Sequence, residues 1–297
     1  IKEDNADTTK KAVVPKGAEV LLESRYPYLD DSQIRYILYS TAVSSGYSVL
    51  DDAEGWGRLN LFEAANGYGA FDTNVTVNMD ASKGGFNVAD NWKNDISGTG
   101  SLTKEGSGML VLSGNNSYTG NTIVDGGSIR ADYASAFGNS SIVNNSVINE
   151  NTDDTLIING NYKQNKSGVL ELTISNENDY VDITGNAELG GKLVLNFKDY
   201  IPSTDAEIIK CASVASQFDE IEINAPEGFE GKIAYNDNGV DLVFSQKTDN
   251  NTAQNEISSP QTGDTSHVVM AFTAFVLSLA GILTASFASK IKSDRIR

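Results

Sequence analysis

A short segment near the end of the sequence holds the residues best suited to covalent chemistry: Ser259, Pro260, Gln261, Thr262 and Gly263. Pro260 restricts the backbone to a preset, kinked course. Thr262 offers a carbonyl carbon for attack, and Gly263, which has no Cβ, leaves room for a thiol nucleophile and is a small leaving group. The pattern predicts an extended peptide that a transpeptidase recognises.

The residues that flank this segment indicate a membrane anchor. Residues 268–288 contain no charged side chain, and about 21 residues make roughly 31 Å of helix, enough to cross a bilayer. Because basic residues stay on the cytoplasmic side, the preceding chain is expected to face outward. The basic residues after the span are Lys290, Lys292, Arg295 and Arg297, opposed by Asp294.

Taken in order, the motif, the apolar span and the basic tail resemble the sorting signal that sortase transpeptidases of Gram-positive bacteria recognise. The usual first residue of that signal is Leu, and Ser259 stands in its place. The resemblance implies cleavage between Thr262 and Gly263 and joining of Thr262 to peptidoglycan. It also implies sortase and peptidoglycan as partners, transient membrane contact through the C-terminal helix, and an extracellular, cell-wall-anchored location.

Composition excludes several classes of function. The formal net charge is −18, so a nucleic-acid-binding surface, which needs clustered Lys and Arg, is not expected. The single cysteine, Cys211, cannot form an internal disulfide and lies in an apolar run typical of a core strand. No glycine loop is followed by Lys-Ser or Lys-Thr, so no nucleotide cofactor is expected. Oxygen-bearing residues at Asn178–Asp179 and Asp182 lack the spacing of known calcium loops, which favours turns over a metal site.

Catalytic residues are not expected in this chain. Its one histidine, His267, excludes a two-histidine phosphatase site. Because His267 lies at the membrane edge of a tail that is expected to be removed, no histidine remains for a Ser-His-Asp triad either. Ser101 and Lys104 have the Ser-x-x-Lys spacing of penicillin-binding enzymes but lack the partner motifs of those enzymes. The pair Asp51–Asp52 is interpreted as a polar loop, because adjacent residues of an extended chain point in opposite directions.

The middle of the sequence has the patterning of short stacked strands. Three segments, 108–112, 168–172 and 191–195, place two leucines on one face of a strand directly after a glycine. Short strands with frequent Asn and Gly turn signals suggest stacked parallel coils or a sandwich. Coils need neighbours to bury their apolar edges, which favours an elongated, repetitive body. Four aromatic residues are interpreted as core residues, with a sugar-binding groove as the alternative: Trp56, Trp92, Tyr118 and Tyr162.

One stretch, Gly98–Asp132, resembles the autotransporter-associated β-strand repeat, which implies a right-handed β-helix turn in a surface passenger. The later part, residues 155–244, resembles the less regular β-helix end that follows such repeats. The positions that carry the repeat resemblance are Gly98, Gly100, Leu102, Lys104, Gly106, Gly108, Leu110, Leu112, Gly114, Tyr118, Thr119, Gly120 and Gly126.

The first seventy residues have a helical character. Asp30 and Gln33 predict a capped helix whose Ile34, Ile37 and Leu38 share one face, and residues 59–65 predict a second short helix. Such a segment is too small to bury its own core, so it is interpreted as the edge of a larger domain. Residues 14–98 resemble the region after the catalytic domain in secreted acid phosphatases of the type-2 phosphatidic-acid-phosphatase family. The alternative is the end of a subtilisin-like protease domain, which Gly55–Asn60 also resembles.

We therefore expect a mostly β fold with a parallel β-helix or solenoid-like body, a small helical N-terminal segment and a C-terminal transmembrane helix. The expected function is a cell-wall-anchored stalk that displays an upstream acid phosphatase, with a subtilisin-like surface protease or a stand-alone adhesin as alternatives. The expected regions are a helical tail (1–71), a β-strand repeat region (72–150), a β-helix end region (151–245), a spacer (246–258) and a sorting signal with its membrane helix (259–297).

Overall fold

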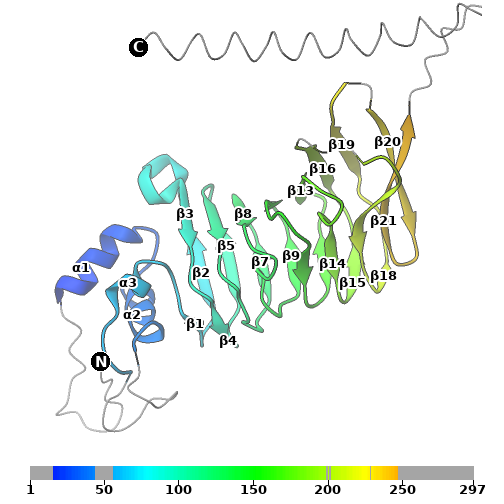
Figure 1. Cartoon of the computed structure of the whole chain (residues 1–297). Helices are drawn as coiled ribbons and strands as arrows, with labels where there is room; N and C mark the ends of the chain where they lie inside the picture. The colour runs from blue at the N-terminus through cyan, green and yellow to red at the C-terminus, as the bar shows by residue number, and fades with distance from the viewer. Residues whose placement is uncertain (1–15, 44–55, 199, 201, 228, 247–297) are drawn as a thin grey trace, which may run out of the picture. The chain divides into compact units, whose positions relative to one another are not determined.

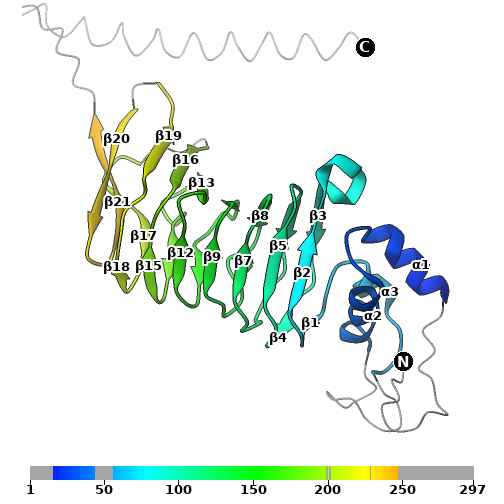
Figure 2. The ribbon, with the colours of Figure 1, turned by 180° about the vertical axis from the view of Figure 1, so that it is seen from behind.

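The computed structural model describes residues 16–43, 56–198, 200, 202–227 and 229–246. These residues belong to one compact unit of mostly β structure, in which parallel strands stack along a common axis (Figure 1). Figure 2 shows the same stack from behind. The prediction of a β-solenoid body is confirmed.

Two seven-stranded parallel sheets form the walls of the solenoid. The strands of the first wall, in spatial order, are β3 (Ala89–Trp92), β6 (Met109–Leu112), β8 (Ser128–Ala131), β10 (Val147–Glu150), β13 (Val169–Ile174), β16 (Lys192–Phe197) and β19 (Glu220–Asn224). Those of the second wall are β2 (Val75–Asn78), β5 (Leu102–Glu105), β7 (Thr122–Val124), β9 (Ile142–Asn144), β12 (Tyr162–Gln164), β15 (Asn186–Glu188) and β18 (Ser213–Val214).

A third sheet joins the solenoid in its later coils and ends in an antiparallel hairpin. Three of its strands, β11, β14 and β17, are parallel. Strand β17 then pairs antiparallel with β21, and β21 pairs antiparallel with β20. A small parallel pair, β1 (Ala70–Phe71) with β4 (Ser97–Gly98), lies in the first coils. The strands of the third sheet are β11 (Leu156–Ile158), β14 (Val181–Ile183), β17 (Ala206–Lys210), β21 (Gly239–Gln246) and β20 (Phe229–Asn236).

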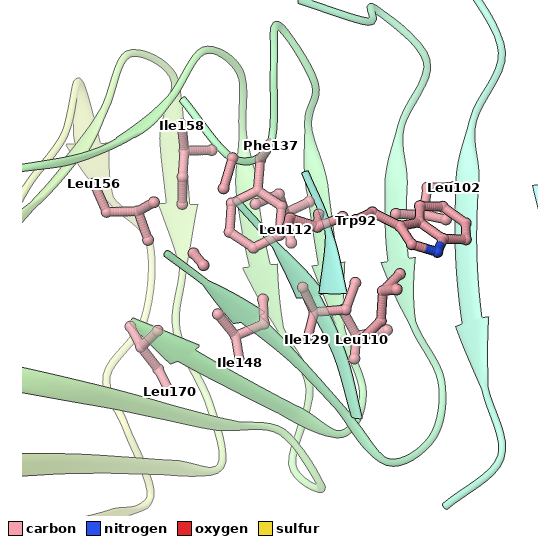
Figure 3. Packing of buried hydrophobic residues seen from close by; sticks show 14 of the residues in the cluster. Trp92, Leu102, Leu110, Leu112, Ile129, Phe137, Ile148, Leu156, Ile158 and Leu170 are labelled. Atoms are coloured by element: carbon pink, nitrogen blue, oxygen red, sulfur yellow. The ribbon is translucent and has the colours of Figure 1, made fainter. Parts of the chain in front are cut away.

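Side chains at equivalent positions of successive coils stack inside the solenoid. In the second wall Leu102, Thr122, Ile142 and Tyr162 pair in turn, which gives the middle coils a 20-residue repeat. In the first wall the inward column contains the predicted leucines, with two isoleucines between them (Figure 3). That column is Leu110, Ile129, Ile148, Leu170 and Leu193, all buried.

The spacing of the three leucine segments has a simple explanation. The 108–112 and 168–172 segments form β6 and β13, and the wall places β8 and β10 between them. Those two strands are as long as β6, but each carries an isoleucine and polar residues in place of the two leucines, so the leucine pattern marks only some of the coils. Trp92, Tyr118 and Tyr162 are fully buried and Cys211 is buried, which confirms their interpretation as core residues.

Three helices precede the solenoid: α1 (Lys16–Arg25), α2 (Asp31–Ser40) and α3 (Leu61–Ala64). The predicted cap of α2 is confirmed, because the Asp30 carboxylate accepts from the Gln33 backbone N–H at 2.9 Å and Gln33 Oε1 accepts from the Asp30 N–H at 3.0 Å. The predicted apolar face of α2 is buried, and the predicted second helix forms at α3 with Asn60 as its N-cap. Helix α1 was not predicted.

The interior also contains buried polar groups. The Lys104 ammonium is completely buried and donates to the carbonyl oxygens of Glu105 at 2.7 Å and Gly126 at 3.1 Å. Burial lowers the pKa of Lys104 to about 8. Glu150 accepts from the backbone N–H groups of Thr152 at 2.6 Å and Thr173 at 3.2 Å. These bonds tie the strands to the turns and to neighbouring coils, because each buried polar group needs a partner.

Among the described residues no helix is long and apolar enough to cross a membrane. The span predicted at residues 268–288 lies outside the described residues.

The buried carboxyl of Glu150 should make stability depend on pH. Burial raises the pKa of Glu150 from 4.5 to about 7, so the folded chain holds the proton more tightly than the unfolded chain does. The contribution of this group to the free energy of unfolding is therefore full below pH 4.5 and is lost as the pH rises through about 7. We expect this loss to reach at most about 3 kcal/mol.

Urea denaturation between pH 4.5 and 8 measures this effect. Glu150→Gln should flatten the decline of the free energy of unfolding with rising pH. Glu188→Gln, at an exposed surface carboxylate, should leave that decline unchanged. If the free energy of unfolding falls equally with pH in wild type and Glu150→Gln, Glu150 does not titrate between pH 4.5 and 8.

Candidate functional site: the junction between the helices and the first coil

A buried ion pair joins the helical segment to the first coil of the solenoid. Arg25, the last residue of α1, places its Nη1 atom 2.5 Å from Oδ2 of Asp90 on β3. The Asp90 side chain is only 1% exposed, whereas that of Arg25 is 20% exposed. A buried carboxylate is stable only with close partners, so the ion pair fixes α1 against β3.

The remaining partners of Asp90 come from both sides of the junction. The Tyr28 hydroxyl donates to Asp90 Oδ2, and the Asn91 backbone N–H donates to Oδ1 at 2.7 Å. The indole Nε1–H of Trp92 donates in turn to the Tyr28 hydroxyl at 3.1 Å. Burial, reinforced by the negative charge of Asp90, raises the pKa of Tyr28 well above its usual value, so its phenol remains a donor.

Arg25 also makes contacts that do not involve Asp90. Its Nε–H donates to the Ala65 carbonyl oxygen at 3.1 Å, which links the end of α1 to the end of α3. Its guanidinium carbon lies 4.6 Å from the Tyr26 ring centroid and 4.2 Å from that of Phe86. The planar guanidinium thus serves as ion-pair partner, hydrogen-bond donor and stacking surface at once, which a lysine could not do.

Aromatic packing continues from the junction into the solenoid. Ring centroids are 5.2 Å apart for Tyr68 and Trp92, 5.4 Å for Tyr68 and Phe71, and 5.0 Å for Phe71 and Tyr118. Gly67 is required here, because its φ is +111° and a Cβ would lie 2.8 Å from the Trp92 ring. The helical segment and the solenoid therefore share one hydrophobic core.

A second contact ties α2 to the second wall, beside a hollow of about 400 Å³. The Gln33 Nε2 atom donates to the Thr76 carbonyl oxygen on β2 at 2.7 Å. Asp30, Tyr36 and Tyr68 are among the lining residues. Within the described part of the chain the buried Tyr68 hydroxyl has no hydrogen-bond partner, whereas the Tyr26 hydroxyl donates to the Ala64 carbonyl oxygen at 2.7 Å.

The junction is built for attachment rather than for catalysis. The Asp90 carboxylate is buried and bonded to Arg25 and Tyr28, so a substrate has no access to it. No group of three or more His, Cys, Asp or Glu side chains that could hold a metal occurs in the ranges that the structure describes. Lys104 of the Ser101–Lys104 pair lies in the core and bonds only to carbonyl oxygens, as expected for a structural residue.

The predicted site residues Ser259, Pro260, Gln261, Thr262 and Gly263 lie outside the described residues, as do His267 and the Asp51–Asp52 pair. The junction itself was missed by the sequence analysis. Arg25 and Asp90 are 65 positions apart, and neither belongs to a local motif that marks it as buried. The one available signal was the density of aromatic residues around them, in Tyr26, Tyr28 and Trp92.

The fold and its repeat define a class of protein. The Passenger-associated-transport-repeat family (PATR) matches residues 102–131, which contain β5 to β8 of the solenoid. These residues lie within the stretch predicted to resemble a repeat of autotransporter passengers. The chain is thus a β-solenoid segment that contains a PATR match and is similar to autotransporter passengers.

The relatives of this chain are autotransporters, proteases and surface antigens. The Neisserial autotransporter lipoprotein NalP of Neisseria meningitidis is 35% identical over 194 residues, which cover 63% of this chain and 17% of that protein. An extracellular serine protease of Serratia marcescens is 31% identical over 160 residues, 43% of this chain and 15% of that protein. The adhesin BmaC autotransporter of Brucella suis is 51% identical over 47 residues, 16% of this chain and 1% of that protein. The chain spans less than one fifth of the length of each.

These findings correct the predicted attachment. The relatives are Gram-negative autotransporter passengers, so the predicted sortase partner, peptidoglycan attachment and Gram-positive origin are wrong. The likeness to an autotransporter over 194 residues outweighs the five-residue motif and its flanking segments. The predicted extracellular location agrees with the names of the relatives.

The predicted acid phosphatase resemblance is also wrong, because the relatives named for an activity are serine proteases. The structure describes the Gly55–Asn60 segment from Trp56 onward, where Val43 and Arg58 form an isolated antiparallel bridge and Asn60 caps α3. The protease and adhesin alternatives both agree with the names of the relatives.

Arg25→Ala should loosen the junction, because it leaves the Asp90 carboxylate buried without its cation. We expect a loss of about 3–5 kcal/mol of stability and faster hydrogen exchange of the α1 amides. Guanidinium denaturation and exchange mass spectrometry measure the two effects. Arg130→Ala, at a more exposed ion pair with Asp132, should cost less than about 1 kcal/mol. The double variant Arg25→Met/Asp90→Asn should recover much of the loss, and its failure to do so would argue against the ion pair.

The two buried tyrosines provide a matched comparison. Tyr68→Phe removes a hydroxyl without a partner, so stability should stay the same or rise by about 1 kcal/mol. Tyr26→Phe removes a hydroxyl that donates to Ala64, so it should cost about 0.5–1.5 kcal/mol. Thermal unfolding of both variants distinguishes them. A larger loss for Tyr68→Phe than for Tyr26→Phe would mean that the Tyr68 hydroxyl has a partner after all.

Proposed function

We propose that this chain is the stalk of a longer extracellular protein and that it displays a subtilisin-like serine protease domain. In this proposal the three helices and the turn at residues 57–60 form the C-terminal edge of that domain. The solenoid begins directly behind them and holds the domain away from its attachment point. In this proposal the activity resides in the longer protein, because the one histidine of this chain, His267, directly precedes the apolar segment 268–288.

The observation that carries the proposal is the two-sided exposure of α1. One face of this helix packs on the shared core through Ala18 and Leu22, and its last residue, Arg25, is locked to β3. Outside this packed face the helix exposes Val20 and Leu21, at 57% and 62%. Two neighbouring apolar side chains on a helix that is already fixed in place indicate a missing part of the same domain.

The relatives support the same proposal. The Serratia relatives are named as extracellular serine proteases, and their similarity covers 43% and 41% of this chain. That is more than a PATR repeat of 30 residues can account for. The turn and helix that the protease alternative requires are both present.

An adhesin without enzymatic activity is the second candidate. The likeness to the Brucella adhesin favours it, with 51% identity over 47 residues. That likeness covers only 16% of this chain, against 43% for the Serratia protease. An adhesin also gives no reason for the exposed face of α1.

A fluorophosphonate probe tests the proposal, because it reacts covalently with activated serines. We expect the longer polypeptide that contains this chain to be labelled and the chain of 297 residues alone to remain unlabelled. Phenylmethylsulfonyl fluoride should block the labelling. A folded longer polypeptide that stays unlabelled but binds host cells would replace the protease with the adhesin.

A further inference from the structure

The first coil differs from those after it in how it passes from the second wall to the first. Between β5 and β6 the chain uses only Gly106–Gly108, and between β7 and β8 only residues 125–127. Between β2 and β3 it makes an excursion of residues 79–88, with two short 3₁₀ helices, η1 (Ala81–Lys83) and η2 (Gly85–Asn87). The walls do not need this extra length, because the other coils close without it.

The excursion places two apolar side chains in solvent. Gly84 and Gly85 have φ values of +72° and +56°, which residues with a Cβ rarely adopt, and they turn the chain between η1 and η2. Directly after this turn Phe86 is 42% exposed and Val88 is 49% exposed. Burying them inside the solenoid is not possible, because β3 starts at Ala89 and its inward positions are Asp90 and Trp92.

This exposed pair lies next to α1. The Phe86 ring stacks against the Arg25 guanidinium at 4.2 Å, and Arg25 is one helical turn after the exposed Leu21. The Arg25–Asp90 ion pair prevents α1 from moving relative to β3. Any domain built on the open face of α1 is therefore held beside the excursion.

We propose that the excursion at residues 79–88 is a docking surface for the body of the domain to which α1 belongs. This inference rests on the proposed function, which supplies a domain upstream of the solenoid. The occupant is thus part of the same longer polypeptide, and it covers Phe86 and Val88 together with Val20 and Leu21. The relatives have length for such a domain, since this chain spans 17% of the Neisseria protein and 15% of the Serratia protease.

This contact gives the stalk a second role, that of a support for the displayed domain. A domain attached through α1 alone would be held at one point. When the excursion also contacts the displayed domain, that domain is held both by α1 and by the first coil, on either side of the Arg25 side chain. The displayed domain then depends on the first coil for part of its own stability.

Two measurements on the longer polypeptide test the docking. Hydrogen exchange of the amides of residues 84–91 should be at least tenfold slower in the longer polypeptide than in this chain alone, because the docked domain shields them. The substitution Val88→Ser should lower the Tm of the displayed domain by about 2–4 °C, and Phe86→Ser/Val88→Ser should lower it further. Val88→Ser leaves both the Arg25–Phe86 stacking and the Arg25–Asp90 ion pair in place, so its effect is separate from that of the junction.

Matched controls isolate the effect of docking. In this chain alone Val88→Ser should leave the Tm unchanged, because the side chain is half exposed there. Tyr133→Ser, at a side chain of similar exposure on a later coil, should leave the Tm unchanged in both polypeptides.

The fluorophosphonate label separates this inference from the proposed function. Labelling of the longer polypeptide with unchanged exchange at residues 84–91 would overturn the docking and leave the protease in place. Slower exchange without labelling would support the docking and reject the protease. If exchange at residues 84–91 is already slow in this chain alone and slows further as its concentration rises, a second copy covers the surface. That result also overturns the inference.

Discussion

The structure depends on one constraint, which is that every stacked coil must have a neighbour on each side. Parallel strands of three or four residues, such as β9, are too short to be stable alone, and their inward side chains are buried only by the coils before and after them. The two ends of the stack therefore need covers of a different kind. At the far end the antiparallel pairing of β17, β21 and β20 ends the third sheet. At the near end α2 and the aromatic residues Tyr68, Phe71 and Trp92 cover the first coil.

The near-end cover explains why charged groups are buried at the junction. A purely apolar contact would hold α1 to the solenoid without fixing its orientation. The Arg25–Asp90 pair, with Tyr28 as a second donor, accepts only one placement of α1 against β3, since both charges need their partners. The pair therefore contributes orientation more than stability, which suits the proposed display of another domain in a fixed position.

The sequence predicts the features that repeat at short range and misses those that form between distant residues. The alternation in Gly108–Leu112 predicted β6 with its inward leucines, and the Asp30–Gln33 pair predicted the cap of α2. Helix α1 was missed because its apolar residues lie on two faces, one of which is exposed. The ion pair was missed because its two residues are 65 positions apart. The wrong prediction of wall attachment arose from a five-residue motif, whereas the relatives match over as many as 194 residues.

The polar interior shows how the solenoid keeps its register. A stack of leucines and isoleucines alone would allow one coil to shift against the next, because such side chains fit many partners. Asn144 donates to the Val169 carbonyl oxygen at 2.9 Å, and Gln164 donates to the Gly190 carbonyl oxygen at 2.7 Å, each bond reaching a fixed backbone atom. A shifted coil would leave these amides buried without partners, which costs more than the bonds contribute when they are made. The solenoid thus combines an apolar column that supplies stability with a polar column that specifies alignment, and the first coil transmits that alignment to the helices through Asp90.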